Sequence, residues 1–278
     1  MKIDSHQHFW QYSPSGHHWI TDDMKVLKRN FMPPDLKEQL DQHNWDGCVA
    51  VQASSSEQET SFLLDLAGQY DFIRGVVGWV DLQDERLEEQ LAYYATYDKL
   101  VGIRHVVQDE PDAHFLLRPD FLRGVALLPQ YNLTYDLLIY EHQLPVAHQF
   151  VSQLPQVRLV VDHIAKPSIA RGELSPWREN IRALATHPNV YCKLSGMVTE
   201  ADWQRWHPDD IIPYLDVVTE AFGPDRLMFG SDWPVCLLAA SYSAVGEIIH
   251  QYFADFSPSE KAGINGKNAV DFYQLSHP

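Results

Sequence analysis

Residues 46–82 read DGCVAVQASSSEQETSFLLDLAGQYDFIRGVVGWVDL and hold one complete strand–helix–strand unit. The runs 46–53 and 72–82 are rich in valine and other apolar residues, which is typical of strands that are buried on both faces. Between them, Ser56 and Glu59 have the spacing of a capping box, and the apolar residues that follow lie on one face of a helix. This order predicts parallel strands joined by a helical crossover.

The same alternation continues along the chain. We expect eight strands, at residues 2–9, 46–53, 72–82, 100–108, 134–140, 157–166, 189–197 and 226–235. Helix candidates separate most of them, and two of these begin at Pro33 and Pro208. Eight such units in 278 residues match an α/β fold of the closed (β/α)8 TIM-barrel type, with residues 1–278 as a single domain. An open, doubly wound sheet is the alternative, but no strand candidate precedes a glycine-rich dinucleotide or P-loop motif.

Composition narrows the class of protein. The chain has 21 Lys and Arg residues against 38 Asp and Glu residues, which gives a formal net charge of −17. This charge repels phosphate backbones and anionic lipid, and no basic patch offsets it, so we expect neither a nucleic-acid nor a membrane partner. Without a signal-peptide pattern or a membrane-spanning apolar run, we expect a cytoplasmic protein. The three cysteines, Cys48, Cys192 and Cys236, fit buried reduced thiols better than disulfides.

Histidines cluster at the end of the first strand candidate. In a TIM barrel, chemistry is assembled at the carboxyl ends of the strands. His6 and His8 lie there, and at the two-residue period of a strand they share one face with Asp4. This spacing suits metal ligands, or paired donors to a substrate oxygen. A lone pair of this kind is weak evidence in a chain with 14 histidines.

Two further strand ends carry polar side chains. The sixth strand candidate ends in Asp162 and His163, which are either a hydrogen-bonded structural pair or part of a site. In the eighth, Gly230 permits close approach of the backbone, and Asp232 follows at the rim. A carboxylate in that place can ligate a metal or take a proton from water, and the alternative role is a helix cap. The candidates for a site at the barrel mouth are therefore His6, His8, His163 and Asp232, each with its alternative role still open.

Several other side chains are candidates for substrate binding. Arg104 and His105 end the fourth strand candidate, but in regular strand geometry they face opposite sides. Lys193 and Ser195 share a face of the seventh and suit hydroxyl groups, although Lys193 is equally a candidate partner for a buried carboxylate. One amide and three indole rings complete the set, with packing as their alternative role: Gln52, Trp19, Trp79 and Trp233.

Nine segments, in this order, resemble the amidohydrolase superfamily of metal-dependent (β/α)8 hydrolases. Within it the likeness is to the amidohydrolase-2 branch, which holds sugar-acid lactonases of the L-fuconolactonase and L-rhamnonolactonase type. The segments are DSHQHFW (4–10), WI (19–20), VQA (51–53), GWVDL (78–82), GIRH (102–105), DHIAKP (162–167), KLSGM (193–197), FGSDWPV (229–235) and NGKNAVDFY (265–273). Each motif is modest alone, but together they span nearly the whole chain.

The resemblance implies roles for individual residues. It makes His6 and His8 metal ligands or carbonyl-binding groups, His163 the strand-six histidine, and Asp232 the acid that activates water. The fifth strand candidate, TYDLLIY, has no histidine, and no lysine on strands four or five is placed to bridge two metals. The resemblance therefore implies at most one divalent ion such as zinc, held by His6, His8 and Asp232. Whether that ion is needed stays open, because the lactonase branch is similar to enzymes that work without metal.

The implied activity is the hydrolysis of a sugar-acid lactone. The expected substrate is an aldono-1,4-lactone such as L-fucono- or L-rhamnonolactone, attacked by water that Asp232 has deprotonated. Two alternatives remain: a metal-dependent decarboxylase or other hydrolase of the same superfamily, and a non-catalytic binding barrel. The expected partner is the small sugar lactone itself, and a homo-oligomer is also open.

Overall fold

The computed structural model describes residues 1–276, and its eight strands form one parallel sheet in the order β1 to β8. Each strand pairs with the next, and a parallel bridge between Gln7 and Trp233 brings the last strand back to the first. The strands are β1 Ile3–Gln7, β2 Gly47–Val51, β3 Ile73–Gly78, β4 Leu100–Val106, β5 Thr134–Leu138, β6 Leu159–Val161, β7 Val190–Leu194 and β8 Leu227–Phe229. The predicted TIM barrel is confirmed.

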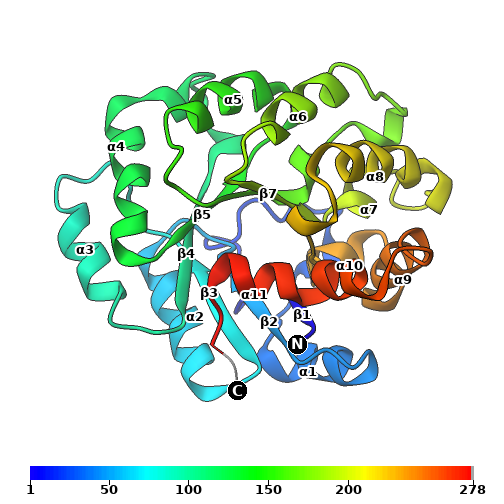
Figure 1. The fold of residues 1–278 in the computed structure, drawn as a ribbon. Helices are drawn as coiled ribbons and strands as arrows, with labels where there is room; N and C mark the ends of the chain where they lie inside the picture. The colour runs from blue at the N-terminus through cyan, green and yellow to red at the C-terminus, as the bar shows by residue number, and fades with distance from the viewer. Residues whose placement is uncertain (277–278) are drawn as a thin grey trace.

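Helices surround this barrel (Figure 1). The main ones are α1 Pro33–Gln42, α2 Glu57–Gln69, α3 Leu87–Tyr94, α4 Pro119–Leu127, α5 Leu144–Ser152, α6 Trp177–Ala185, α8 Pro208–Phe222 and α9 Tyr242–Tyr252. Three short helices, α7 Met197–Glu200, α10 Pro258–Ala262 and α11 Asn268–Tyr273, complete the set. The sequence predictions did not include α4.

The barrel interior is apolar at one end and closed there by α11 (Figure 1). Inward side chains such as Ile3, Val49 and Met228 form one buried cluster with Phe272 and Tyr273 of α11. A larger apolar cluster fills the layer between the strands and the outer helices. Because strand side chains alternate, strands such as β2 and β8 contribute to both clusters. The carboxyl ends of the strands, opposite α11, carry the polar residues.

Strands six and eight are shorter than predicted. The expected ranges 157–166 and 226–235 contain ladders of only three residues each, Leu159–Val161 and Leu227–Phe229. After β6, the residues His163 to Lys166 all have positive φ, between 47° and 60°, so the chain leaves the sheet as a left-handed turn. Apolar composition continues through this turn, which is why the sequence pattern overran the strand.

The capping box before α2 is formed only in half. Ser56 caps the helix as predicted, because its hydroxyl accepts a hydrogen bond from the Glu59 amide at 3.1 Å. The Glu59 carboxylate, however, accepts from the amide of Ala53 at 2.9 Å instead of returning to Ser56. Glu59 therefore ties the helix to the end of β2.

A bulge in β1 separates Asp4 from the two histidines. Between Asp4 and Gln7 the register shifts, with one residue more on β1 than on β2. Asp4 consequently faces the outer layer, where its carboxylate accepts a 3.1 Å hydrogen bond from the hydroxyl of Tyr242 in α9. The prediction that Asp4 shares a face with His6 and His8 is wrong, because β1 is not a regular strand.

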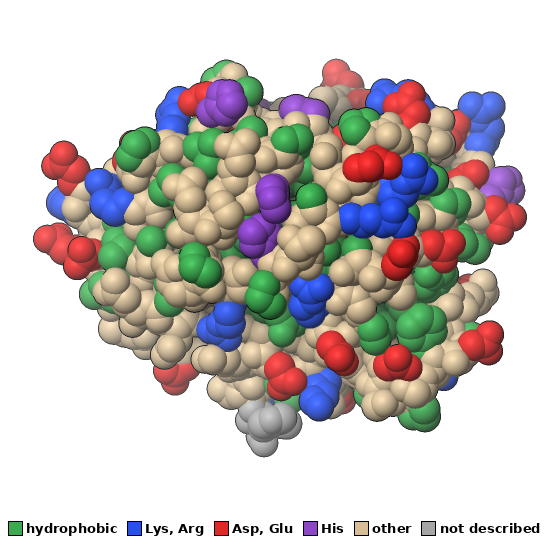
Figure 2. All heavy atoms as spheres, turned by 45° about the horizontal axis from the view of Figure 1, so that its top comes forward, with side chains coloured by type: hydrophobic (Ala, Val, Ile, Leu, Met, Phe, Trp, Pro, Cys, Tyr) green, Lys and Arg blue, Asp and Glu red, His purple; other side chains and the backbone are tan. Residues whose placement is uncertain are grey.

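Charged side chains of both signs are found on the surface. On the face in Figure 2, Lys and Arg side chains lie beside Asp and Glu side chains. Among residues 1–276, no helix is both long and apolar enough to cross a bilayer. All three cysteines are free and buried.

Candidate active site

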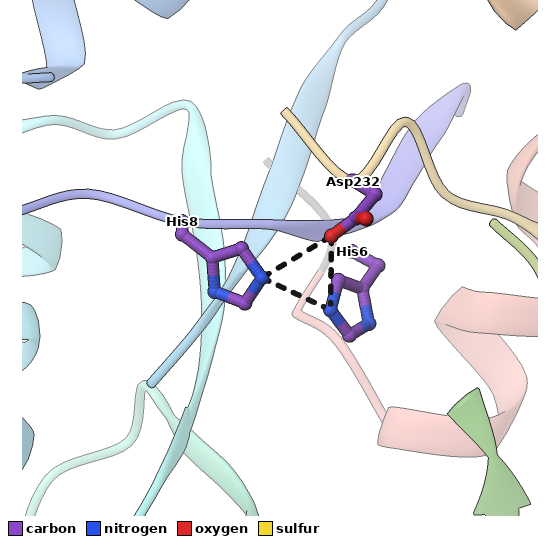
Figure 3. A group of neighbouring side chains, drawn as sticks. All are labelled: His6, His8 and Asp232. Atoms are coloured by element: carbon purple, nitrogen blue, oxygen red, sulfur yellow. Dashed lines mark hydrogen bonds and ion pairs between the residues drawn. The ribbon is translucent and has the colours of Figure 1, made fainter. Parts of the chain in front are cut away.

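His6, His8 and Asp232 converge at the open end of the barrel (Figure 3). The Nε2 atoms of His6 and His8 are 3.2 Å apart. Asp232 Oδ1 lies 3.9 Å from His6 Nε2 and 3.4 Å from His8 Nε2. Backbone pairing holds them together, because the Asp232 amide donates to the His6 carbonyl at 2.8 Å. Gly230 permits this approach, since a Cβ there would lie 2.6 Å from the Cβ of His6.

His163 reaches the same place from the left-handed turn after β6. Its Nε2 lies 4.0 Å from Asp232 Oδ1, and its Nδ1 lies 2.9 Å from the hydroxyl of Ser195. Gly196 makes room for the ring, because a Cβ there would lie 2.6 Å from His163 Nδ1. Non-glycine residues pay an energetic cost for positive φ, and such conformations cluster at functional sites. The turn and the glycine together place the fourth predicted side chain beside the other three.

A buried network of charges lies beneath the histidines. Lys193 Nζ is 2.5 Å from Asp136 Oδ2 and 3.1 Å from Asp162 Oδ1. Arg104 donates a 3.0 Å hydrogen bond to Asp162 Oδ2. The network touches His6, whose Nδ1 lies 3.1 Å from Lys193 Nζ and 3.4 Å from Asp162 Oδ1. Two carboxylates balance two cations, so these buried groups leave no unpaired charge.

Burial sets the protonation of the site. It lowers the pKa of His6 well below the usual range, and it lowers the pKa of His163 to about 4 although the charge of Asp232 opposes it. Burial alone would raise the pKa of Asp232, but the neighbouring imidazoles of His163 and His8 outweigh it, and the pKa is lowered. At neutral pH, Asp232 is therefore an ionised carboxylate beside the neutral imidazoles of His6 and His163.

The donor set fits one divalent ion. His8 Nδ1 lies 2.8 Å from the carbonyl oxygen of Val51, which can only accept, so Nδ1 carries the proton and Nε2 is a free lone pair. That lone pair faces His6 Nε2 and Asp232 Oδ1 at 3.2 and 3.4 Å. Ligands about 2.0–2.2 Å from a tetrahedral zinc ion are separated by distances close to these. Residues 1–276 hold two groups of donors close enough to bind one metal ion. One is the predicted set of His6, His8 and Asp232, and the other is His6, Asp162 and His163, in which Asp162 is already paired with Arg104 and Lys193.

These groups open into a cavity of about 520 Å³. Its lining includes His8, His163 and Asp232, and also three predicted substrate-binding residues, Trp19, Arg104 and His105. Arg104 points inward, as its bond to Asp162 requires. His105 stacks on Phe115 with ring centroids 4.9 Å apart, so it packs in the outer layer and still borders the cavity.

The other predicted substrate-binding residues are not among those lining the cavity: Gln52, Trp79, Lys193, Ser195 and Trp233. Gln52 donates a 3.2 Å hydrogen bond to the Arg104 carbonyl, and the Trp79 indole donates at 3.2 Å to His105 Nδ1. Lys193 has carboxylate partners, the alternative that the sequence left open. Trp233 packs against Phe31 with ring centroids 5.3 Å apart. These side chains therefore lie outside the cavity lining, and Gln52 and Trp79 contact residues that line it.

Sequence reasoning missed three charged residues near the site. Asp136 stands in the otherwise apolar strand TYDLLIY, and an acid in a buried strand needs a partner, which was an available signal. Lys166 is the last residue of the left-handed turn within DHIAKP and lines the cavity. Glu110 also lines the cavity, but it stands in an irregular segment after β4 that carries no motif.

Comparison with known proteins agrees with this geometry. The amidohydrolase family model, Amidohydro_2, matches residues 3–275. Over its whole length the chain is 42% identical to a Burkholderia multivorans protein named L-fucono-1,5-lactonase and 36% identical to a Burkholderia ambifaria protein of the same name, and it covers 97% of each. A crystal structure of a Burkholderia multivorans amidohydrolase with bound zinc matches with a TM-score of 0.97 at 42% identity, over 99% of this chain and 100% of that one. The chain belongs to the amidohydrolase family.

Proposed function

We propose that this protein is a lactonase that opens L-fucono-1,5-lactone or a closely related sugar lactone. The observation that carries the proposal is the convergence of an ionised Asp232 with three histidines at a cavity of about 520 Å³. The two relatives that match over the full length share a name that specifies a 1,5-lactone. We therefore propose the six-membered ring in place of the 1,4-lactone expected from the sequence.

Asp232 acts as the base in the proposed reaction. Its carboxylate takes a proton from water, the water oxygen bonds to the lactone carbonyl carbon, and the carbonyl becomes a tetrahedral oxyanion. The bond from that carbon to the ring oxygen then breaks, and Asp232 returns the proton to the leaving oxygen. The product is an open-chain hydroxy acid, which releases a proton to the solvent at neutral pH.

His163 is placed to stabilise the oxyanion. When the Ser195 hydroxyl donates to Nδ1, across 2.9 Å, the neutral ring of His163 carries its proton on Nε2, on the side of Asp232. His8 cannot donate from Nε2, because its proton is held at Nδ1 by the Val51 carbonyl. A zinc ion held by His6, His8 and Asp232 would supply Lewis-acid polarisation of the carbonyl.

A proton-release assay tests the function. Wild-type protein is mixed with L-fucono-1,5-lactone, with the 1,4-lactone of the same sugar and with no lactone, in weak buffer with a pH indicator. Spontaneous opening of each lactone is subtracted. We expect acceleration well above background and a preference for the 1,5-ring. Metal analysis of the same sample, before and after chelation, reports whether activity follows zinc content. Failure to accelerate any sugar lactone, together with CO2 release from a carboxylated aromatic acid, would reject the proposal in favour of a decarboxylase.

A further inference from the structure

A carboxylate on the cavity wall is held in place by an imidazole. Glu110 lies in the segment after β4, and its Oε1 is 2.7 Å from His105 Nε2. The pair lines the same cavity as Asp232, but Glu110 forms no hydrogen bond or ion pair with the residues proposed for the reaction. Its side chain is 25% exposed, so it is partly shielded and still accessible from the cavity.

The direction of this hydrogen bond follows from a third side chain. The Trp79 indole donates at 3.2 Å to His105 Nδ1, and an indole N–H can only donate. His105 Nδ1 is therefore an acceptor, and the ring carries its proton on Nε2, which donates to Glu110. Stacking on Phe115, with an interplanar angle of 12°, fixes the plane of the ring. The orientation of Glu110 is thus built into the packing of the outer layer.

The second oxygen of Glu110 is free to accept. Within residues 1–276, no side chain or amide donates a hydrogen bond to Oε2. A sugar lactone carries several hydroxyl groups, and each of them is a donor that a carboxylate oxygen can accept. An unsubstituted lactone has the same reacting carbonyl but no such donor. A carboxylate that is already oriented at this wall therefore favours the binding of a hydroxylated lactone over an unsubstituted one.

We propose that Glu110 is a specificity-determining residue that accepts hydrogen bonds from the hydroxyl groups of the lactone, and that His105 is its positioning residue. This inference rests on the proposed lactonase function and adds the part of the site that recognises the sugar. Asp232 and His163 act at the carbonyl end of the lactone, and Glu110 accepts hydrogen bonds from the hydroxylated part of the ring.

The test compares two lactones and three variants. L-Fucono-1,5-lactone carries hydroxyl groups, and δ-valerolactone has the same ring size without them. Glu110→Gln keeps an oxygen for the bond from His105 and replaces the free acceptor by an NH2 donor. His105→Phe keeps the stacking on Phe115 and removes the support. Glu85→Gln is the control for charge and residue type, because it makes the same change at an exposed carboxylate that does not line the cavity.

We expect Glu110→Gln to lower kcat/KM for L-fucono-1,5-lactone by roughly 10- to 100-fold, mainly through KM, because a hydrogen bond to a charged group is lost. The value for δ-valerolactone should stay within about twofold of wild type, as should both values for Glu85→Gln. His105→Phe should shift the ratio of the kcat/KM values for the two lactones in the same direction as Glu110→Gln.

Two results would overturn the inference: an equal loss on both lactones, or a loss on L-fucono-1,5-lactone confined to kcat. The first indicates a structural role, and the second places Glu110 in the chemical step. If wild-type protein opens neither lactone, the proposed function fails before any variant is compared, and this inference fails with it. If wild-type protein opens L-fucono-1,5-lactone and Glu110→Gln matches it, the function stands and the role of Glu110 is rejected.

Discussion

Asp232 is a carboxylate within 4.0 Å of three imidazoles, and its lowered pKa keeps it ionised at neutral pH. Replacing it by Asn preserves its size and removes both the charge and the basicity. We expect Asp232→Asn to lower kcat by about 10³-fold, since general-base catalysis contributes 10²- to 10⁴-fold. Circular dichroism and the melting temperature should stay close to wild type. Near-normal turnover of the sugar lactone would exclude Asp232 as the base.

The carboxyl group of Glu59 makes the stability of the protein depend on pH. Burial raises its pKa from 4.5 to about 7, so the folded protein holds this proton more tightly than the unfolded chain does. The stability that the protonated group contributes is complete below pH 4.5 and is lost as pH rises through 7. Glu59→Gln mimics the protonated form and keeps an oxygen for the Ala53 amide.

We therefore expect Glu59→Gln to be more stable than wild type at pH 8.5, by up to about 3 kcal/mol. At pH 4.5 the two proteins should have the same free energy of unfolding. Urea denaturation at both pH values checks this. A gap that does not depend on pH would mean that the carboxylate titrates equally in the folded and unfolded states.

The left-handed turn after β6 works only with a glycine opposite it. Gly196 has φ +65°, and a Cβ there would lie 2.6 Å from His163 Nδ1. Gly172 also has φ +65°, but its Cβ would meet nothing within 4 Å. Substituting either glycine by Ala would strain the backbone equally, but only the substitution at Gly196 would also cause a clash with His163.

We expect Gly196→Ala and Gly172→Ala to lose about 1 kcal/mol each from positive φ. Gly196→Ala should in addition displace His163 and lower kcat/KM for the sugar lactone by at least about tenfold, since small displacements of catalytic groups are costly. Lactonase kinetics and thermal melts of both variants check this. Equal activity in the two variants would mean that His163 tolerates the added methyl group.

At the level of elements, the sequence predicted the eight strands but not their ends. Buried apolar runs marked most of the strands, because both faces of a parallel barrel strand are covered. The turns and bulges that interrupt regular strands could not be recognised from the sequence pattern. The left-handed turn at His163 kept an apolar composition, and the bulge in β1 reversed the face of Asp4.

The same distinction explains the site. His6, His8, His163 and Asp232 were predictable because they stand in family motifs at strand ends. Glu110 was not, because its place depends on the packing of His105 against Phe115, and tertiary contacts of this kind have no local signature.

Across the whole molecule, the buried charge network joins four strands beneath the site. Lys193 in β7 is fully buried and neutralises Asp136 and Asp162 together with Arg104. Lys193→Met should destabilise the protein by about 3–5 kcal/mol, because it leaves a buried carboxylate without its cation. Adding Asp136→Asn should recover part of this loss, since the uncompensated charge is then removed. Denaturant unfolding of the single and double variants measures both, and an additive double variant would contradict the pairing.

The hydroxyl of Tyr273 donates a 2.8 Å hydrogen bond to Asp136 Oδ2. Tyr273 ends α11, the last helix that the structure describes, whereas His6 lies in the first strand. During synthesis the ribosome therefore releases His6 and His8 early and the residue that completes their supporting network about 270 positions later. A nascent chain that still lacks α11 holds a barrel with one open end and a buried acid short of a donor. We therefore expect chains that end before α11 to carry the histidines without the activity.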